Sequence, residues 1–259
     1  MTPILAGRPL QPAIRRLDVG GRLLTNRLTR LISTRHYDMR NEPYVVNEMK
    51  EKACYVSLDF KSDLEKTWKG TKGEKREDYL TGGGIAKDYV LPDSHTRFHG
   101  IVQDYQPGVV ARARKGGVSN EDILTLRNER FAVPELLFNP SDIGLLQPGL
   151  ADLVMQSLSV LPEGLWPALL VNIVVVGGNA LFDNFVQRLQ ADLVARVPDV
   201  LIVRVTRPAD PIANTWVGAA NFAKHENANK LAVTKQEYEE NGSAWVARKF
   251  AAGLGVPGS

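Results

Sequence analysis

The chain has 259 residues, of which 44% are hydrophobic, so it can fold around one large or two smaller cores. Its 32 basic and 29 acidic residues give a net charge of only +3, which excludes a strong overall field that would draw the protein to nucleic acid. Cys54 is the single cysteine, which excludes an internal disulfide and a cysteine zinc cluster and favours a reducing compartment. The N-terminal stretch lacks a secretory signal, and no apolar run is long enough to span a bilayer, so we expect a soluble intracellular protein.

The first sixty residues predict two extended pieces and two amphipathic helices. The extended pieces cover 3–6 and 14–19, and the pair Gly20 and Gly21 follows them. The first helix is opened by this glycine turn, and the second begins just after Pro43. Apolar residues at helical spacing mark the two helices: Leu24, Leu28, Leu31 and Ile32 in the first, and Val46, Met49, Ala53 and Val56 in the second.

The segment 61–117 is rich in glycine and has no sustained periodicity. We expect a long, partly disordered insertion with one short strand at 88–91. Its basic cluster is either a solvated surface or a chromatin-binding patch, which salt-sensitive DNA binding would distinguish. The cluster comprises Lys66, Lys69, Lys72, Lys75 and Arg76.

The second half of the chain alternates strands and helices, which predicts an α/β fold. Leu124 and Leu126 precede a polar turn and Phe131 and Val133 follow it, a pattern typical of a β-hairpin. A helix is expected at 151–158 and a strand at 200–205. A last helical part near Trp216 leads into a polar tail.

The stretch NIVVVGGNALFDNFVQRL, residues 172–189, predicts a buried strand, a glycine turn and a helix. The continuous apolar run 173–176 favours a strand covered on both faces, and the helix carries an apolar stripe. The turn at Gly177 and Gly178 lets a ligand approach the backbone closely, but the same glycines also serve tight geometry without any ligand. Neither a Walker A motif nor a complete GxGxxG is present. The stripe comprises Phe182, Phe185, Leu189 and Leu193.

Other chemically suggestive residues favour ordinary roles. His95 and His99 have the spacing of two ligands on one helix face, but they lie in a loop without a following carboxylate, so we expect surface side chains. Cys54 is expected to be a small buried hydrophobe. No GxSxG elbow supports a hydrolase, and Lys50 and Glu51 gain interest only if they converge on the glycine turns.

Five motifs in the same order resemble successive motifs of the actin family. They are LDVGGRLLT at 17–25, MKEKACYVSLDF at 49–60, NERFAVPELLFNPSDIG at 128–144, VVVGGNALF at 174–182 and TKQEYEENG at 234–242. Within the family, FAVPELLFNPSDIG, LDVGGRLLTN and ADPIANTW are most similar to the actin-related protein six subfamily.

The resemblance implies an α/β actin/Hsp70-like (ribonuclease H-like) fold, in which two lobes clasp an adenine nucleotide. Residues 1–19 and 147–212 would form subdomain three, and 20–146 subdomain four with the flexible insertion at about 61–117. Residues 213–259 would be the C-terminal remainder of subdomain one. The fold is expected to be incomplete, because the family's two phosphate hairpins would lie upstream of Met1.

The resemblance also implies an adenosine-side site. It places Gly21 near the ribose and Lys50 and Glu51 along the base and sugar. A lysine of the family's base pocket falls on Ile212, which removes a cation. We expect ATP or ADP in a full-length parent protein, and none bound tightly by this truncated chain. The turn residues implied around the adenine are Gly177, Gly178, Asn179, Leu181 and Phe182.

The function implied is that of a non-catalytic adapter in an ATP-dependent chromatin remodelling complex that exchanges the Z histone variant into nucleosomes. The expected partners are the remodelling ATPase motor and a zinc-HIT-type subunit, with nucleosomes contacted indirectly, no membrane contact and no homopolymer. The expected location is the nucleus and also the cytoplasm. The alternative is an actin-like protein that hydrolyses ATP or forms filaments.

Overall fold

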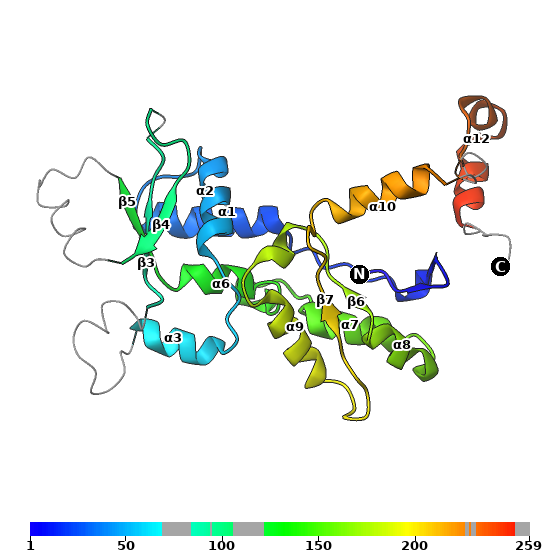
Figure 1. Cartoon of the computed structure of the whole chain (residues 1–259), viewed down its shortest axis with the longest axis horizontal. Helices are drawn as coiled ribbons and strands as arrows, with labels where there is room; N and C mark the ends of the chain where they lie inside the picture. The colour runs from blue at the N-terminus through cyan, green and yellow to red at the C-terminus, as the bar shows by residue number, and fades with distance from the viewer. Residues whose placement is uncertain (69–83, 94, 106–121, 226–227, 229–231, 252–259) are drawn as a thin grey trace, which may run out of the picture.

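The computed structural model describes residues 1–68, 84–93, 95–105, 122–225, 228 and 232–251 (Figure 1). The described chain combines helices with short strands, which is consistent with the predicted α/β class. Figure 1 shows a sheet with the first two helices of the chain at one end of the molecule, further helices in the middle, and the last helices extending from the other end.

The chain begins with a small antiparallel hairpin. β1 (Ile4–Leu5) pairs with β2 (Arg8–Pro9), and the first predicted strand is thereby confirmed. The predicted extended piece at 14–19 follows the 3-10 turn η1 (Gln11–Ala13) and begins with Ile14 in an extended conformation, and no described strand pairs with it.

The two predicted N-terminal helices are present and build one wall of the candidate site. α1 (Gly21–Arg35) begins after the extended Gly20 and buries the predicted stripe except Leu31, which is partly buried. α2 (Pro43–Ala53) has Pro43 at its first position, where a missing N–H costs nothing. The helix ends before Val56, because Cys54 already has extended dihedral angles. Val56 is nevertheless fully buried, and its N–H donates to the Asp183 carbonyl at 3.0 Å.

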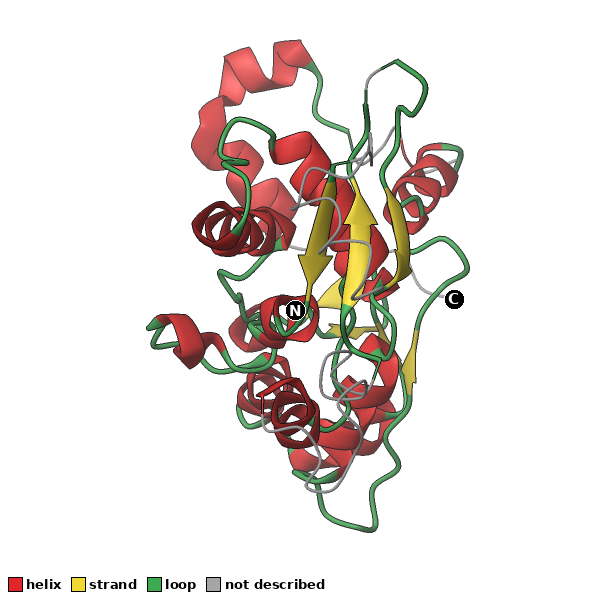
Figure 2. Cartoon of the chain, turned by 90° about the vertical axis from the view of Figure 1, so that its left-hand side faces the viewer, coloured by secondary structure: helices red, strands yellow, loops and turns green. Residues whose placement is uncertain are grey.

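The described part of the predicted insertion is more regular than its composition suggested. α3 (Phe60–Trp68) opens it, and β3 (Lys87–Val90) confirms the predicted strand within one residue. β3 lies between β4 (Ile101–Asp104) and β5 (Ile123–Leu126) in an antiparallel sheet, which Figure 2 shows with helices behind it. Of the basic cluster only Lys66 is described, and it pairs with Asp63 at 3.2 Å. Lys69, Lys72, Lys75 and Arg76 lie outside the described residues.

The hairpin predicted at 124–133 is wrong in its second half. β5 is a strand, but the residues after it form α6 (Glu129–Glu135). Phe131, Val133 and both terminal glutamates of α6 are buried, so the segment is enclosed on all sides. A short segment without an exposed face shows no reliable period, and two apolar residues in alternation cannot distinguish a strand from a helix.

The glycine turn joins a short parallel strand pair to a helix. β6 (Ile173–Val174) pairs with β7 (Val205–Thr206), so the strand predicted at 200–205 is confirmed only at its last residue. Gly177 has a φ of 93°, a conformation that glycine adopts without steric cost, and η4 (Gly178–Leu181) follows it. α9 (Phe185–Val194) then buries Phe185, Leu189 and Leu193, and Phe182 is buried just before it.

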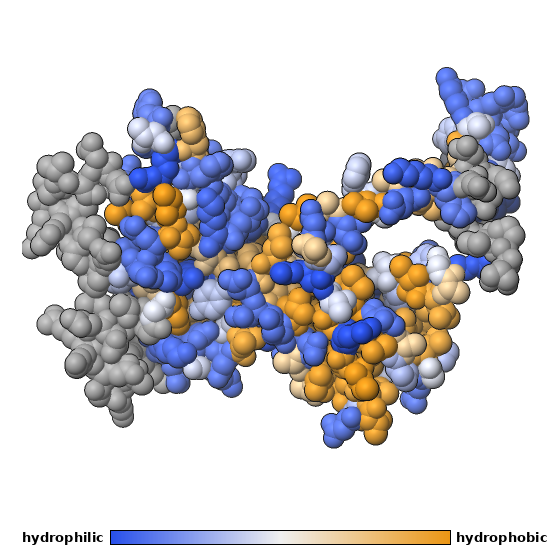
Figure 3. All heavy atoms as spheres, viewed as in Figure 1, coloured by the Kyte–Doolittle hydropathy of each residue, from blue (hydrophilic) through white to orange (hydrophobic). Residues whose placement is uncertain are grey.

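The expectation that 173–176 is covered on both faces is wrong for this chain. Val174 is 60% exposed and Val176 is 48% exposed, whereas Ile173 and Val175 are partly buried. The run therefore has the two-residue period of a strand with one free face, although every residue is apolar. Figure 3 shows further apolar side chains gathered on the surface. Val194 at the end of α9 is exposed, as are Val200 and Ile202 after the helix.

The remaining helices follow the predictions closely. α7 (Leu150–Leu158) confirms the helix at 151–158, and the short α8 (Trp166–Leu170) comes next. α10 (Asn214–Ala223) confirms the helical part near Trp216. The predicted polar tail is also helical, as α12 (Lys235–Ala251), with a break at Gly242.

Among the described helices, none combines the length and the apolar character that crossing a bilayer demands.

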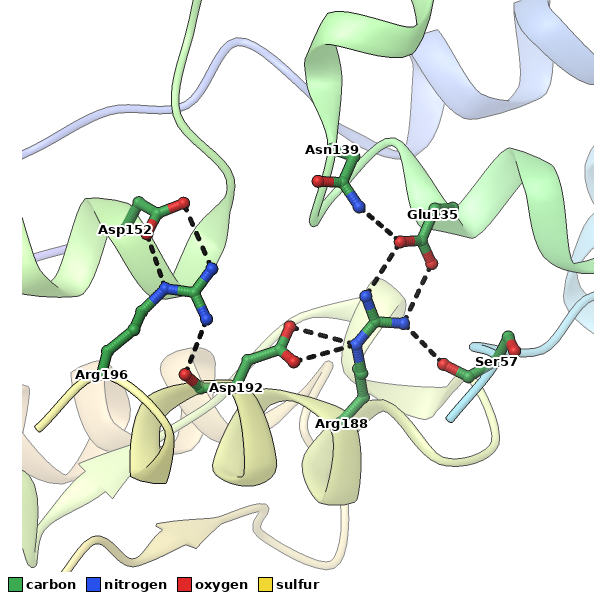
Figure 4. A network of polar contacts seen from close by, with 7 residues as sticks. All are labelled: Ser57, Glu135, Asn139, Asp152, Arg188, Asp192 and Arg196. Carbon is green, nitrogen blue, oxygen red and sulfur yellow. Dashed lines mark hydrogen bonds and ion pairs between the residues drawn. The ribbon is translucent and has the colours of Figure 1, made fainter. Parts of the chain in front are cut away.

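A buried ion pair fastens α9 to the middle of the molecule (Figure 4). The Arg188 guanidinium of α9 donates to both oxygens of Glu135 in α6, at 2.9 and 3.1 Å. It also donates to the Ser57 carbonyl at 2.7 Å and pairs with Asp192 at 3.0 Å. The Glu135 side chain is 1% exposed, and Asn139 donates to it at 2.6 Å. Each charge is therefore compensated by several partners, which a buried ion pair requires.

The Glu48 carboxylate of α2 holds the helix against the neighbouring sheet. It accepts from Lys52 and His99 at 2.8 Å, from the Tyr89 hydroxyl at 3.2 Å and from the Gly100 N–H at 3.3 Å. Burial opposes ionisation of Glu48, but hydrogen bonds from Lys52, Gly100 and His99 outweigh it and lower its pKa to about 2. Gly100 is required here, because a Cβ would lie 2.0 Å from the Tyr89 hydroxyl oxygen.

We expect Arg188→Met to lower the free energy of unfolding by about 3–5 kcal/mol, because Glu135 would be left buried without its cation. The matched control is Arg196→Met, which removes the exposed pair with Asp152 just beyond the same helix (Figure 4) and should cost at most about 1 kcal/mol. Urea unfolding of both variants measures the two values. Equal losses would contradict a special role for the buried pair.

The lowered pKa of Glu48 predicts a pH-dependent stability. A carboxyl group whose pKa is lower in the folded than in the unfolded protein stabilises the fold at pH values above the unfolded pKa. This contribution disappears as the pH falls through the folded pKa. Glu48→Gln should therefore lower the free energy of unfolding by about 1–2 kcal/mol at pH 7 and by almost nothing near pH 2. The value at pH 7 is reduced to allow for the exposure of Lys52 and His99. Denaturant titrations across this range check it. The control is Glu163→Gln, at an exposed carboxylate, which should change the free energy of unfolding at pH 7 by no more than about 0.5 kcal/mol.

Candidate functional site

A cavity of about 710 Å³ lies between α1, α2 and the turn that follows β6. The eight residues that the sequence predicted for a ligand site come from three distant parts of the chain, and all eight line this cavity. They are Gly21, Lys50, Glu51, Gly177, Gly178, Asn179, Leu181 and Phe182. Seven further residues line it, of which the sequence analysis had considered only Ile212 for this site: Arg22, Thr25, Asn26, Pro43, Asn47, Val176 and Ile212.

Gly21 permits the closest approach of the three segments. A Cβ on Gly21 would lie 3.3 Å from Oδ1 of Asn179 and 3.6 Å from Nζ of Lys50. The first distance is tighter than ordinary van der Waals contact, so a side chain here would push the 177–182 turn away from α1. The φ of Gly21 lies outside the left-handed region, so the backbone conformation does not require glycine here. The glycine is needed because the segments pack closely around it.

Lys50 is a buried cation held by neutral oxygens. Its side chain leaves α2 and donates to the Gly21 carbonyl at 3.2 Å, the Thr25 hydroxyl at 3.0 Å and the Asn47 amide oxygen at 2.8 Å. The residue is only 4% exposed, and burial lowers the pKa of its ammonium group, with Glu51 acting in the opposite direction. The ammonium group thus supplies a fixed positive charge at the wall of the cavity.

Asn47 is a site residue that the sequence analysis missed. Its amide oxygen accepts from Lys50, and its amide nitrogen donates to Glu51 Oε1 at 2.7 Å, so it connects the two predicted residues. The signal was available: Asn47 precedes Lys50 by three positions and Glu51 by four, which places all three side chains on one face of α2.

The turn 177–182 forms the opposite wall. The Gly177 N–H donates to the Pro211 carbonyl at 2.7 Å, which brings Ile212 to the cavity. Ile212 Cδ1 lies 4.0 Å from the position of a Cβ on Gly178, and its side chain is 63% exposed. Phe182 is buried and Leu181 is 46% exposed. Apart from Asn179 the side chains of this wall are apolar, so the cavity offers mainly apolar contact on one side and charge with hydrogen-bonding groups on the other.

The other residues singled out from the sequence do not join this cavity. Cys54 is buried, and burial raises the pKa of its thiol to about 12, as expected for a small core residue. His95 and His99 are exposed, and the Nδ1 of His99 lies 2.8 Å from a Glu48 oxygen. Within the part of the chain that the structure describes, no cluster of three or more His, Cys, Asp or Glu side chains is arranged to hold a metal ion.

Comparison with known proteins shows the family and agrees with the fold. The family model described as Actin matches residues 1–251. The chain is 77% identical to Actin-related protein 6 of Neurospora crassa over 99% of its length, and it spans 57% of that protein. Proteins of the same name in Drosophila melanogaster and Arabidopsis thaliana are 40% and 36% identical over 93% and 96% of the chain, which covers 57% and 60% of them. The chain belongs to the actin family and has the α/β fold of that family.

Proposed function

We propose that the chain is part of a non-catalytic actin-related subunit that serves as an adapter in an ATP-dependent chromatin remodelling complex. The complex would exchange the Z histone variant into nucleosomes and so regulate transcription. The observation that carries the proposal is the 77% identity to Actin-related protein 6 of Neurospora crassa over 99% of the chain. Similarity at this level usually preserves the surfaces by which a subunit is recognised, although fold alone would not fix the function.

The proposed partners are the remodelling ATPase motor and a zinc-HIT-type subunit, in the nucleus and also in the cytoplasm. The motor would hydrolyse ATP, and this subunit would dock on it and contact nucleosomes indirectly without forming homopolymers. An adapter needs a stable surface rather than a catalytic centre. Ile212 supports this proposal, because it lines the cavity with an apolar side chain where the resemblance to actin implies a lysine.

Purification of the tagged full-length protein from nuclear extract tests the adapter proposal. We expect a remodelling ATPase and a zinc-HIT-type subunit to co-purify in fixed stoichiometry, whereas the tag alone retains neither. Depletion of the protein should reduce the occupancy of the Z histone variant at nucleosomes. Failure of any remodelling ATPase to co-purify would refute the proposal, and ATP-dependent sedimentation of the purified protein would favour a filament-forming actin instead.

We also propose that the 710 Å³ cavity receives the adenosine part of ATP or ADP in the full-length protein. Its support is the convergence of α1, α2 and the 177–182 turn around one cavity with an apolar wall and a fixed ammonium group. Bases are commonly bound between apolar walls with a few placed polar groups. The proposal concerns binding alone and assigns no hydrolysis to these residues.

Restoring a cation at the wall should strengthen nucleotide binding. We expect Ile212→Lys to tighten ADP binding by the full-length protein about fivefold, because its ammonium group would add one hydrogen bond to the adenosine, worth roughly 1 kcal/mol. The control is Ile202→Lys, which makes the same change at an exposed isoleucine outside the cavity and should leave the affinity unchanged. Calorimetric titration measures both. A similar effect from the two substitutions would mean that ADP does not occupy this cavity.

A further inference from the structure

A second cavity, of about 620 Å³, lies beside the first and shares only Phe182 with it. Four parts of the chain line it. They are the end of α2 with the residues after it, the start of α6, the segment that enters α9, and Arg207 just after β7. The lining residues that carry the argument are Lys52, Tyr55, Arg130, Asp183, Gln187 and Arg207.

Positive charge predominates at this cavity. Three of its lining residues are cationic, and Asp183 is the one carboxylate among the residues that line it. Lys52 is already paired with Glu48 at 2.8 Å. No described carboxylate lies within ion-pair distance of Arg130 or Arg207.

The two arginines are positioned by backbone carbonyls instead. Arg130 Nε donates to the Ala53 carbonyl at 2.8 Å, a second guanidinium nitrogen donates to the Ile85 carbonyl, and burial lowers the pKa of the group. Arg207 Nη1 donates to the Ala180 carbonyl at 2.8 Å. Neutral carbonyls fix a guanidinium without cancelling its charge, so each arginine keeps charge and donors for an anion.

Negative charge near Arg130 comes from Asp183 and from Glu129, and Glu129 is already paired with Arg35 at 3.1 Å. The Tyr55 ring lies under the Arg130 guanidinium at 5.0 Å, and burial raises the pKa of its hydroxyl to about 12, so it stays neutral at physiological pH. Val186 and Gln187 in the first turn of the ten-residue α9 also line the cavity. The Asn184 side chain donates to the Val56 carbonyl and does not cap that turn. The partial positive charge of the helix end therefore adds to that of the arginines.

We propose that this cavity binds a small phosphorylated molecule, whose phosphate group pairs with Arg130 and Arg207. Phosphate suits the site because planar guanidinium groups match its oxygens in paired hydrogen bonds. The Phe182 and Tyr55 rings offer contact area for a small organic group. The proposal does not depend on nucleotide binding in the first cavity, because none of the charged residues is shared between the two.

Calorimetric titration of the 259-residue chain with pyrophosphate tests the proposal. We expect saturable binding, and Arg207→Gln should weaken it about tenfold, the usual effect of losing a charge-assisted hydrogen bond. The matched control is Arg204→Gln, three residues earlier, where the guanidinium also donates to a carbonyl, that of Val171, but does not line the cavity. Pyrophosphate that fails to bind at millimolar concentration, or equal effects of the two variants, would overturn the proposal.

A second variant keeps the test valid if Arg207→Gln does not fold. Gln187 is exposed in the first turn of α9, where a negative charge is favourable for the helix, so Gln187→Glu should fold normally. It should nevertheless weaken pyrophosphate binding about tenfold by repulsion, whereas the neutral Gln187→Ala should not. Malonate tests the anion class. If it binds as tightly as pyrophosphate, the assignment to phosphate is wrong.

Discussion

The buried pair between Arg188 and Glu135 is the interaction on which the rest of the structure depends. Two charges inside a protein lose their hydration, a cost of several kcal/mol for each ion that only well-placed partners recover. Here the partners come from α6, from α9 and from the backbone at Ser57, just after α2. These three elements are far apart in sequence. A displacement of any one would break a charged hydrogen bond, so the pair fixes their relative positions.

That fixed arrangement explains why two cavities occur next to each other. α2 supplies Lys50 and Glu51 to one cavity, and its last turn and following loop supply Lys52 and Tyr55 to the other. The chain between the glycine turn and α9 likewise contributes to both, with the buried Phe182 between them. The sites are therefore products of how three elements meet, and neither is contained in a single motif.

The sequence predicted most reliably those elements that have one buried face. α1 and α7 bury one side and expose the other, so their apolar residues recur at a helical period. Prediction failed where that contrast was missing. α6 has no exposed residue and no period. In 200–205 the apolar Val200 and Ile202 are exposed whereas Val203 and Val205 are buried, so hydrophobicity did not report burial there. The ends of elements depended on local dihedral angles, as at Cys54, which a pattern of residues does not encode.

The sequence predicted eight of the residues that line the first cavity, but not the contacts between them. The order of the motifs was enough to choose Gly21, Lys50 and the 177–182 turn, because it indicates which residues come together in the fold. It could not show that Asn47 connects Lys50 to Glu51, since that depends on rotamers chosen after the helices pack. The isolated glycine pairs were ambiguous for the same reason: their meaning depends on which segment the fold brings opposite them.

The three hydrogen bonds of Lys50 have a consequence for any ligand that enters the first cavity. An ammonium group has three protons, and Gly21, Thr25 and Asn47 occupy as many directions. The lysine therefore acts on a ligand as a stationary charge rather than as a hydrogen-bond donor. Its side-chain entropy, roughly 2 kcal/mol in a free lysine, is already lost when the chain folds. The ligand need not order this group, so folding has prepared this wall in advance of binding.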